Sequence, residues 1–201
     1  MLHGQRSHLV PVTGEHVTEL RRIRAAPEAR RYWRDVEASS GWPLDEPSVA
    51  RFAVLVDGEV RGLAQYTEED DEDYRHASID IFLDPVIHGT GLGRDAVATL
   101  VRYLVDHRGH HRLVIDPAAD NTAAISCYAS VGFRPVGVMR RYERDAHGEG
   151  WHDGLLMDLL AEELKRGSTD GPRPGPAALA QPTSVDLTSH SSTRMGRGDT
   201  R

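Results

Sequence analysis

The feature that most constrains the fold of this chain is a glycine-rich stretch, His88-Gly89-Thr90-Gly91-Leu92-Gly93-Arg94. A strand-like run, residues 77–83, comes directly before it. Apolar residues then recur at helical spacing, at Leu92, Ala96, Leu100 and Leu104. Glycines at alternate positions leave backbone N–H groups uncovered, and the helix directs its positive dipole end to the same place. The stretch therefore predicts a strand–loop–helix unit that cradles a pyrophosphate.

Two common pyrophosphate-binding loops do not fit the spacing of this stretch. The dinucleotide-binding fingerprint is G-x-G-x-x-G, whereas the third glycine here comes one residue early. A P-loop continues with Lys and then Ser or Thr, whereas Arg94 and Asp95 follow the last glycine here. A plain strand-to-helix turn with a flexible backbone is the alternative that remains open at this point.

A second segment, residues 113–133, has the same strand-then-helix order. A β-branched strand ends at Asp116-Pro117, because Pro117 cannot donate a hydrogen bond to a ladder. Asp120 or Asn121 can cap the next helix, and Gly132 can close it.

Together these two motifs resemble the GCN5-related N-acetyltransferase (GNAT) family. The family's loop pattern, R/Q-x-x-G-x-G/A, falls on His88, Gly91 and Gly93, with His88 departing from the usual Arg or Gln. The later run D-P-x-x-x-N…A-I-x-C-Y-x-x-x-G-F, from Asp116 to Phe133, is similar to the aminoglycoside 6′-N-acetyltransferase branch. The resemblance covers roughly residues 8–160.

The resemblance implies an α/β (α+β) fold with a mixed, mostly antiparallel twisted sheet, splayed central strands and flanking helices. The patterns predict strands at 8–12, 51–56, 59–66, 77–83, 112–115, 133–142 and 151–160. They predict helices at 14–25, from Pro27 through Tyr32 and Trp33, from about 91, and at 122–131. Asp57-Gly58 is a strong hairpin signal. We expect one acyltransferase domain over 1–165 and a disordered tail rich in Gly, Pro, Ser and Thr over 166–201.

Composition narrows the class of protein. The chain has 201 residues, a net charge of −7 and a single cysteine, Cys127, so no intrachain disulfide can form. The acidic balance argues against a nucleic-acid partner and suits a cationic small molecule. We find no signal peptide and no apolar run long enough for a bilayer, and we expect a cytoplasmic protein without a membrane partner.

By resemblance, acetyl-CoA is the co-substrate and no metal is needed. Pantetheine would lie between the strand edges at 81–83 and 114–116, pairing with exposed backbone as an added strand does. The pyrophosphate would lie on the loop. The expected coenzyme-binding residues are Ile81, Phe82, Leu83, His88, Gly89, Thr90, Gly91, Leu92, Gly93, Arg94 and Asn121. Asn121 has an alternative role as a helix cap.

Three residues are the expected catalytic group. Tyr128 matches the family's leaving-group tyrosine and would protonate the departing thiolate, although a core aromatic is its alternative role. Asp80 and Asp116 match acidic positions near the acceptor. A carboxylate is a poor base for an ammonium, since their pKa values differ by about six units, or roughly 8 kcal/mol. We therefore expect both to orient the amine electrostatically; Asp116 could instead form a turn before Pro117.

The acceptor side is predicted from an acidic run and an aromatic residue. Six consecutive acids could dock a polycation beside the cleft, or they could form a solvated loop: Glu68, Glu69, Asp70, Asp71, Glu72 and Asp73. Trp33 could form a wall of the cleft or belong to the core. His107, His110 and His111 lie close in sequence, but no adjacent ligand completes a metal set, and we expect none.

The resemblance and the motifs thus predict an acetyl-CoA-dependent N-acetyltransferase for a primary amine, and they leave three hypotheses open. The first hypothesis is an aminoglycoside-like polycation, as in antibiotic resistance. The second is the N-terminal or lysine amine of a peptide or protein. A third, from a different class, is a non-catalytic acyl-CoA sensor. The oligomeric state stays open.

Overall fold

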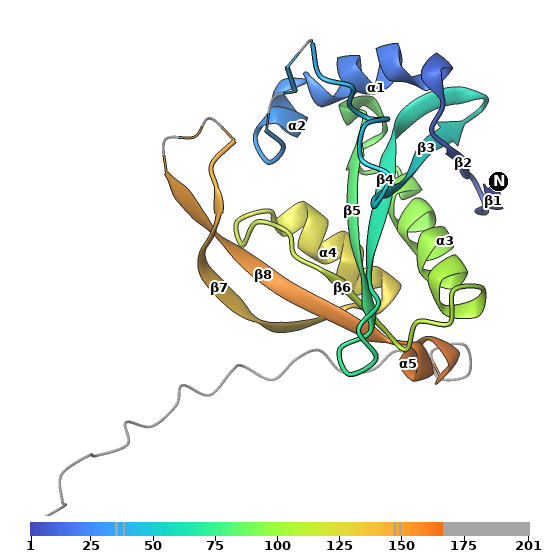
Figure 1. Cartoon of the computed structure of the whole chain (residues 1–201), viewed down its shortest axis with the longest axis vertical. Helices are drawn as coiled ribbons and strands as arrows, with labels where there is room; N and C mark the ends of the chain where they lie inside the picture. The colour runs from blue at the N-terminus through green and yellow to red at the C-terminus, as the bar shows by residue number, and fades with distance from the viewer. Residues whose placement is uncertain (35, 38, 147, 149, 167–201) are drawn as a thin grey trace, which may run out of the picture. The chain divides into compact units, whose positions relative to one another are not determined.

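The structure is a computed structural model that describes residues 1–34, 36–37, 39–146, 148 and 150–166, without the side chains of 165 and 166. Figure 1 shows the arrangement of its elements. In chain order they are β1 (Leu2–His3), β2 (His8–Pro11), η1 (Gly14–His16), α1 (Val17–Arg24), α2 (Pro27–Arg30), β3 (Ala50–Val56), β4 (Glu59–Glu69), β5 (His76–Leu83), η2 (Pro85–Ile87), α3 (Leu92–Asp106), β6 (Arg112–Ile115), α4 (Thr122–Val131), β7 (Arg134–Arg144), β8 (Trp151–Leu160) and α5 (Ala161–Arg166).

The described strands form one eight-stranded sheet in the order β1-β2-β3-β4-β5-β6-β8-β7. Its neighbouring strands are antiparallel except β5 and β6, which are parallel. The expected mixed, mostly antiparallel sheet is therefore confirmed.

The two central strands separate along their length. β5 and β6 pair only near their start, where Ala77 faces Leu113 and Ser78 faces Val114. β5 continues to Leu83 on its β4 side, so within the described residues its other edge is unpaired from Ile79 onward. This separation is the splay that the resemblance implied, and it opens toward the loop that follows β5.

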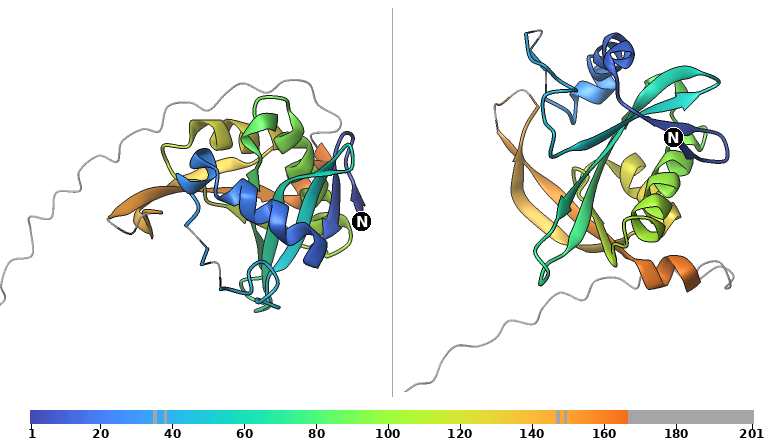
Figure 2. Two further views of the ribbon diagram at one scale, coloured as in Figure 1. Left: turned by 90° about the horizontal axis from the view of Figure 1, so that it is seen from above. Right: turned by 45° about the vertical axis from the view of Figure 1, so that its right-hand side comes forward.

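Helices cover both faces of the sheet, as Figure 2 shows. α3 buries Ala96, Val97, Leu100, Val101 and Leu104 in a core cluster with Ile79, Leu113 and Met157, and Tyr128 of α4 joins the same cluster. α1 buries Leu20 and Ile23 on the opposite face with Leu63 and Phe82. Since side chains alternate along β5, Asp80 lies on the α1 face with Phe82, and Ile79 and Ile81 lie on the α3 face.

Several predicted boundaries were wrong. The helix from Pro27 ends at Arg30, before Tyr32 and Trp33. Beyond it the chain turns, and the Trp33 ring packs edge-on against Phe82 with centroids 5.0 Å apart, so tertiary packing rather than helix propensity fixes these residues. β4 extends to Glu69 instead of ending at 66. β1 and α5 were not predicted, and the expected disordered tail beyond Arg166 lies outside the described residues.

Candidate active site

The glycine loop has the conformation that its residues predicted. Gly91 is the N-cap of α3 with a φ of 85°, a left-handed conformation that favours glycine, and Gly89 has a φ of 73°. A Cβ on Gly89 would meet nothing within 4 Å, and one on Gly91 would meet only Nη1 of Arg6, at 3.7 Å. The first N–H groups of α3 have no intrahelical acceptor by geometry. An open backbone beside a helix N-terminus fits a phosphate group.

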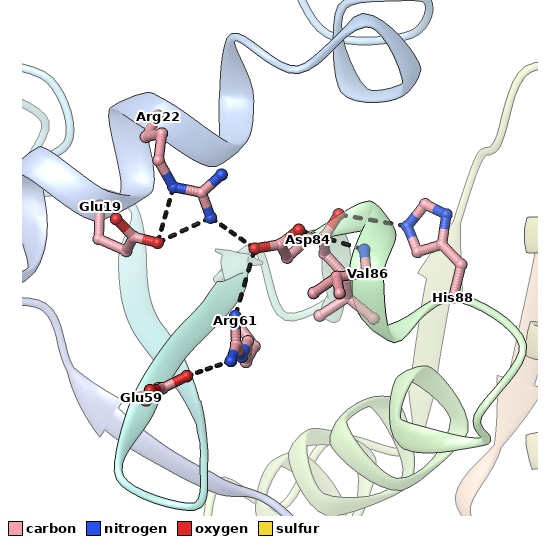
Figure 3. A network of polar contacts seen from close by, with 8 residues as sticks. Glu19, Arg22, Glu59, Arg61, Asp84, Val86 and His88 are labelled. Atoms are coloured by element: carbon pink, nitrogen blue, oxygen red, sulfur yellow. Dashed lines mark hydrogen bonds and ion pairs between the residues drawn. The ribbon is translucent and has the colours of Figure 1, made fainter.

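Buried Asp84 fixes the point where β5 enters this loop (Figure 3). One carboxylate oxygen accepts a hydrogen bond from the Val86 amide at 3.2 Å and caps η2. The other accepts from Nη2 of Arg22 on α1 at 2.5 Å and lies 3.6 Å from Nη1 of Arg61 on β4. These partners outweigh the cost of burial and lower the pKa of Asp84. The charged cluster therefore ties the start of the loop to α1 and to β4.

His88 and Asn121 make local contacts in this structure. Nε2 of His88 lies 3.2 Å from the carbonyl oxygen of Leu83, so the ring is turned back onto the end of β5 (Figure 3). Oδ1 of Asn121 accepts the Ala124 amide at 3.1 Å and caps α4. The cap that was an alternative role for Asn121 is thus confirmed, and its contact with a coenzyme stays a prediction.

Asp80 lies at the splay as the end of a polar chain. Its carboxylate accepts a hydrogen bond from Nε2 of Gln65, which faces it on β4, at 3.2 Å. Oε1 of Gln65 in turn accepts from Nε of Arg51 on β3 at 3.0 Å. Burial raises the pKa of Asp80, the Gln65 hydrogen bond opposes the rise, and the charges of Asp116 and Glu143 add to it. Gln65 was missed in the sequence analysis, because only the register of β4 and β5 places it opposite Asp80.

Asp116, directly after β6, and Tyr128, on α4, both lie near Asp80, since the charges of the two aspartates act on the Tyr128 phenol. Burial also raises the pKa of Asp116, partly offset by a hydrogen bond from the phenol of Tyr142. Tyr128 is buried, and burial is the main cause of the raised pKa of its phenol, with Cys127, Asp80 and Asp116 adding to the rise. Tyr128 is therefore protonated at neutral pH, which is the state that a proton donor needs, while the raised pKa makes it a weaker acid than a free phenol.

Two further residues near the aspartates, Tyr142 and Glu143, lie on β7 and were missed. The β7–β8 register shifts between Met139 and Glu143, so a bulge takes Tyr142 out of the ladder. Its phenol bonds Asp116, which raises the pKa of Tyr142 to about 12. A Cβ on Gly154 would lie 2.9 Å from Cδ1 of Tyr142. Glycine at 154 thus leaves room for the ring, and no sequence periodicity reveals a bulge of this kind.

The predicted position of the acidic run beside the acceptor cleft was wrong. Residues 68–73 lie at the β4–β5 hairpin, where Glu69 faces His76, whereas Leu83 and the glycine loop lie at the other end of β5. Glu68 is moreover a strand residue that pairs with Arg108 and His110, at 2.7 and 2.6 Å. The run therefore neither forms one loop nor borders the splay, because β4 is longer than its apolar pattern suggested.

The remaining candidates are placed as follows. Trp33 is half-buried on the α1 face, against Phe82 and with the guanidinium of Arg24 5.2 Å from its ring centroid. His107 stacks on Tyr103, and His110 bonds Glu68. In the part of the chain that the structure describes, no three His, Cys, Asp or Glu side chains are grouped to hold a metal ion. None of the described helices is both long and apolar enough to span a membrane.

Comparison with known proteins now decides the family. The acetyltransferase (GNAT) family model matches residues 17–133, more than half of the chain. This chain belongs to the GNAT family. The GNAT match spans α1 through α4, and therefore includes the glycine loop, both candidate aspartates and Tyr128.

Relatives of this GNAT chain differ in what their names say they acetylate. Two of them, from Salinispora arenicola and Salinispora tropica, are named mycothiol acetyltransferases and are 37 and 41% identical over 31 and 25% of this chain, which is 20 and 17% of those proteins. The chain is 41% identical to N-alpha-acetyltransferase RimI of Mycobacterium tuberculosis over 64 residues, 32% of this chain and 38% of that protein. It is 35% identical to the ribosomal protein bS18-alanine N-acetyltransferase of Salmonella typhimurium over 82 residues, 39% of this chain and 51% of that protein. The matches thus span only about two fifths and about half of the length of these two relatives.

Solved structures share the fold more completely. AAC(6')-Ib in complex with ribostamycin and coenzyme A matches with a TM-score of 0.67 and 21% identity, over 83% of this chain and 100% of that one. At this identity the likeness concerns the fold alone. It confirms the GNAT architecture and leaves the aminoglycoside branch a hypothesis.

Proposed function

We propose that this chain is an acetyl-CoA-dependent N-acetyltransferase that acts on a primary amine. The observation that carries the proposal is the splay between β5 and β6, with an open glycine loop beyond β5 and Asp80, Asp116 and Tyr128 converging beside it. Family membership gives this arrangement its expected co-substrate.

The coenzyme would bind along the splay. Its pantetheine would pair with the free backbone edge of Ile81, Phe82 and Leu83, and its pyrophosphate would lie on residues 88–94. In support, this edge of β5 has no ladder partner within the described residues beyond Ser78, and Gly89 and Gly91 leave their backbone open. Acetyl-CoA supplies an acyl group as a thioester.

The chain's own residues would then orient the amine and move protons. Asp80 and Asp116 hold the incoming ammonium, which loses a proton to solvent before its nitrogen attacks the acyl carbon. The new C–N bond forms as the C–S bond breaks, and Tyr128 gives its phenolic proton to the departing sulfur. As the C–N bond forms, the nitrogen loses a second proton to solvent, and solvent returns a proton to Tyr128. Of the two protons that the ammonium loses, one is therefore balanced by the proton on the thiol and the other stays in solvent.

For the acceptor, we infer the α-amine at the N-terminus of a peptide or protein. In support, two of the relatives, at 41 and 35% identity, carry names of this activity, whereas two others are named mycothiol acetyltransferases. The main sequence argument for a polycation was that residues 68–73 line the acceptor cleft. That argument no longer holds, because these residues lie at the β4–β5 hairpin.

An aminoglycoside-like polyamine is the second candidate, because the site holds more negative charge than one ammonium needs. Asp80, Asp116 and Glu143 are close enough for the charges of the other two to raise the pKa of Asp80. A second ammonium on the acceptor would relieve this repulsion.

A competitive acceptor screen tests the proposal. The protein is incubated with acetyl-CoA and equal concentrations of N-terminal peptides, N-terminally blocked lysine peptides, an aminoglycoside and spermine, with thiol release and product mass as readouts. We expect acetylation of the free peptide N-terminus first. Preference for the aminoglycoside would select the second candidate. Coenzyme binding by calorimetry without turnover on any amine would instead identify a sensor and refute the enzyme.

A further inference from the structure

Arg6 lies against the glycine loop although 82 residues separate it from His88. It belongs to the turn between β1 and β2. Its Nη1 donates a hydrogen bond to the Thr90 carbonyl oxygen at 2.7 Å. The same nitrogen lies 3.7 Å from a Cβ position on Gly91. A guanidinium therefore borders the open backbone where a phosphate would lie.

Asp95, in the first turn of α3, holds this turn in place. Its carboxylate accepts hydrogen bonds from the amides of Gln5, Arg6 and Ser7 at 2.9, 3.0 and 2.9 Å, and from Oγ of Ser7 at 2.8 Å. Three consecutive amides and a hydroxyl on one carboxylate fix the backbone at Arg6 relative to the helix. These bonds outweigh desolvation and lower the pKa of Asp95, so it is ionised at neutral pH.

The guanidinium of Arg6 has N–H donors that its bond to Thr90 does not use. Arginine has several N–H donors in a rigid fork that suits phosphate oxygens. The bond to Thr90 uses one of them, and no carboxylate of the described residues forms an ion pair with Arg6. His88, at the Arg or Gln position of the loop pattern, is turned onto the Leu83 carbonyl.

We propose that Arg6 is a coenzyme-binding residue that donates hydrogen bonds to a phosphate group of acyl-CoA, and that Asp95 positions it there. The proposal rests on the proposed function, since it needs acyl-CoA at the glycine loop. It adds to that site a cation from the N-terminal hairpin, outside the matched family region, which begins at residue 17.

The direct test is titration calorimetry of CoA binding to Arg6→Ala at low salt. Hydrogen bonds to charged groups and the exposure of this side chain together give an expected loss of about tenfold in affinity. The matched control is Arg102→Ala, which removes the same charge from an exposed position farther along α3. We expect its Kd to equal that of the wild type. Equal weakening in both variants would show a general charge effect and overturn the proposal.

Repeating the titration with 3′-dephospho-CoA shows which phosphate group of the coenzyme Arg6 contacts. If Arg6 contacts the pyrophosphate, Arg6→Ala weakens this ligand as much as it weakens CoA. If Arg6 contacts the 3′-phosphate, the variant and the wild type bind it equally. An unchanged Kd for both ligands overturns the proposal.

Asp95→Asn tests the positioning role, because two mechanisms predict opposite signs. Removing a negative charge near a phosphate should strengthen CoA binding if only electrostatics acts. Releasing the turn should weaken it if Asp95 works through Arg6, and Arg6→Ala should then have less effect in the Asp95→Asn background. Stronger binding by Asp95→Asn would overturn the positioning role.

The control variants distinguish a failure of the Arg6 proposal from a failure of the proposed acetyltransferase function. If the wild type fails to bind CoA at all, the proposed function falls. If the wild type binds and Gly91→Val abolishes binding while Arg6→Ala does not change it, only the role of Arg6 falls. Melting temperatures of all variants check that each is folded.

Discussion

Replacing Glu68 with Gln should destabilise the protein and leave acceptor kinetics unchanged. Glu68 accepts hydrogen bonds from Nη2 and Nε of Arg108 at 2.7 and 3.0 Å, and its Oε1 lies 2.6 Å from Nε2 of His110. These contacts join the β4–β5 hairpin to the segment between α3 and β6. They hold the pKa of Glu68 at about 2, below its ordinary 4.5.

The magnitude follows from this difference in pKa. One pKa unit is about 1.4 kcal/mol, so the full effect would be roughly 3 kcal/mol. The side chain of Glu68 is 19% exposed but that of Arg108 is 46% exposed, so solvent screens part of the attraction. We therefore expect Glu68→Gln to lower the free energy of unfolding by about 1–2 kcal/mol at pH 7, or roughly 2–8 °C in Tm.

The pH dependence has a definite sign. A carboxyl group whose pKa is lower in the folded state adds stability above its unfolded pKa and loses it as pH falls through its folded pKa. The gap between wild type and Glu68→Gln should thus be constant above pH 5. It should shrink as pH falls from about 4.5 toward about 2.

Urea unfolding at a series of pH values measures this gap. Glu72→Gln is the matched control, since Glu72 is an exposed member of the same acidic run. We expect that control to change stability little at any pH. A gap for Glu68 no larger than for Glu72, or one that stays constant from pH 6 to pH 3, would refute the reasoning.

Three further predictions concern the site. Gly91→Val should weaken CoA binding more than tenfold in calorimetry, because a β-branched residue disfavours the φ of 85° and covers the open backbone, and an unchanged Kd would contradict the loop assignment. Tyr128→Phe should lower kcat by about 10²–10⁴ with little change in KM, and a wild-type rate of the chemical step in single turnovers would reduce Tyr128 to packing. Gly154→Ala should displace the Tyr142 ring, whose Cδ1 would lie 2.9 Å from the new Cβ, and should lower kcat/KM for the acceptor while CoA affinity stays constant; equal acceptor kinetics would separate Tyr142 from the site.

Local chemistry made much of the fold predictable from sequence. The helix at 122–131 was predicted with the bounds that the structure gives, because Asn121 caps one end and Gly132 closes the other. The Asp57-Gly58 hairpin and the loop at Gly91 were likewise set by residues that tolerate positive φ. Each of these signals acts over a few neighbouring residues, so it can be recognised without a tertiary context.

Contacts between residues far apart in the sequence were predicted wrongly or missed. The acidic run was assigned to the cleft because it precedes the Asp80 strand, but strand direction places it at the other end of β5. Tyr142 was missed because a bulge, rather than strand alternation, aims it at Asp116. Arg6 was missed because only the contact of the first hairpin with Asp95 brings it to the loop.

The sequence by itself determined the strand–loop–helix units, the glycine loop and the family, since each depends on a short run of residues and its backbone preferences. The tertiary structure alone decided which charges share a site. Asp80 lies near Asp116 because the parallel register of β5 and β6 carries both residues to the same level, and the packing of α4 brings Tyr128 near them. Glu68 meets Arg108 because β4 extends past its apolar residues. Register and strand direction set those distances, and they arise from packing across the whole sheet rather than from any one segment.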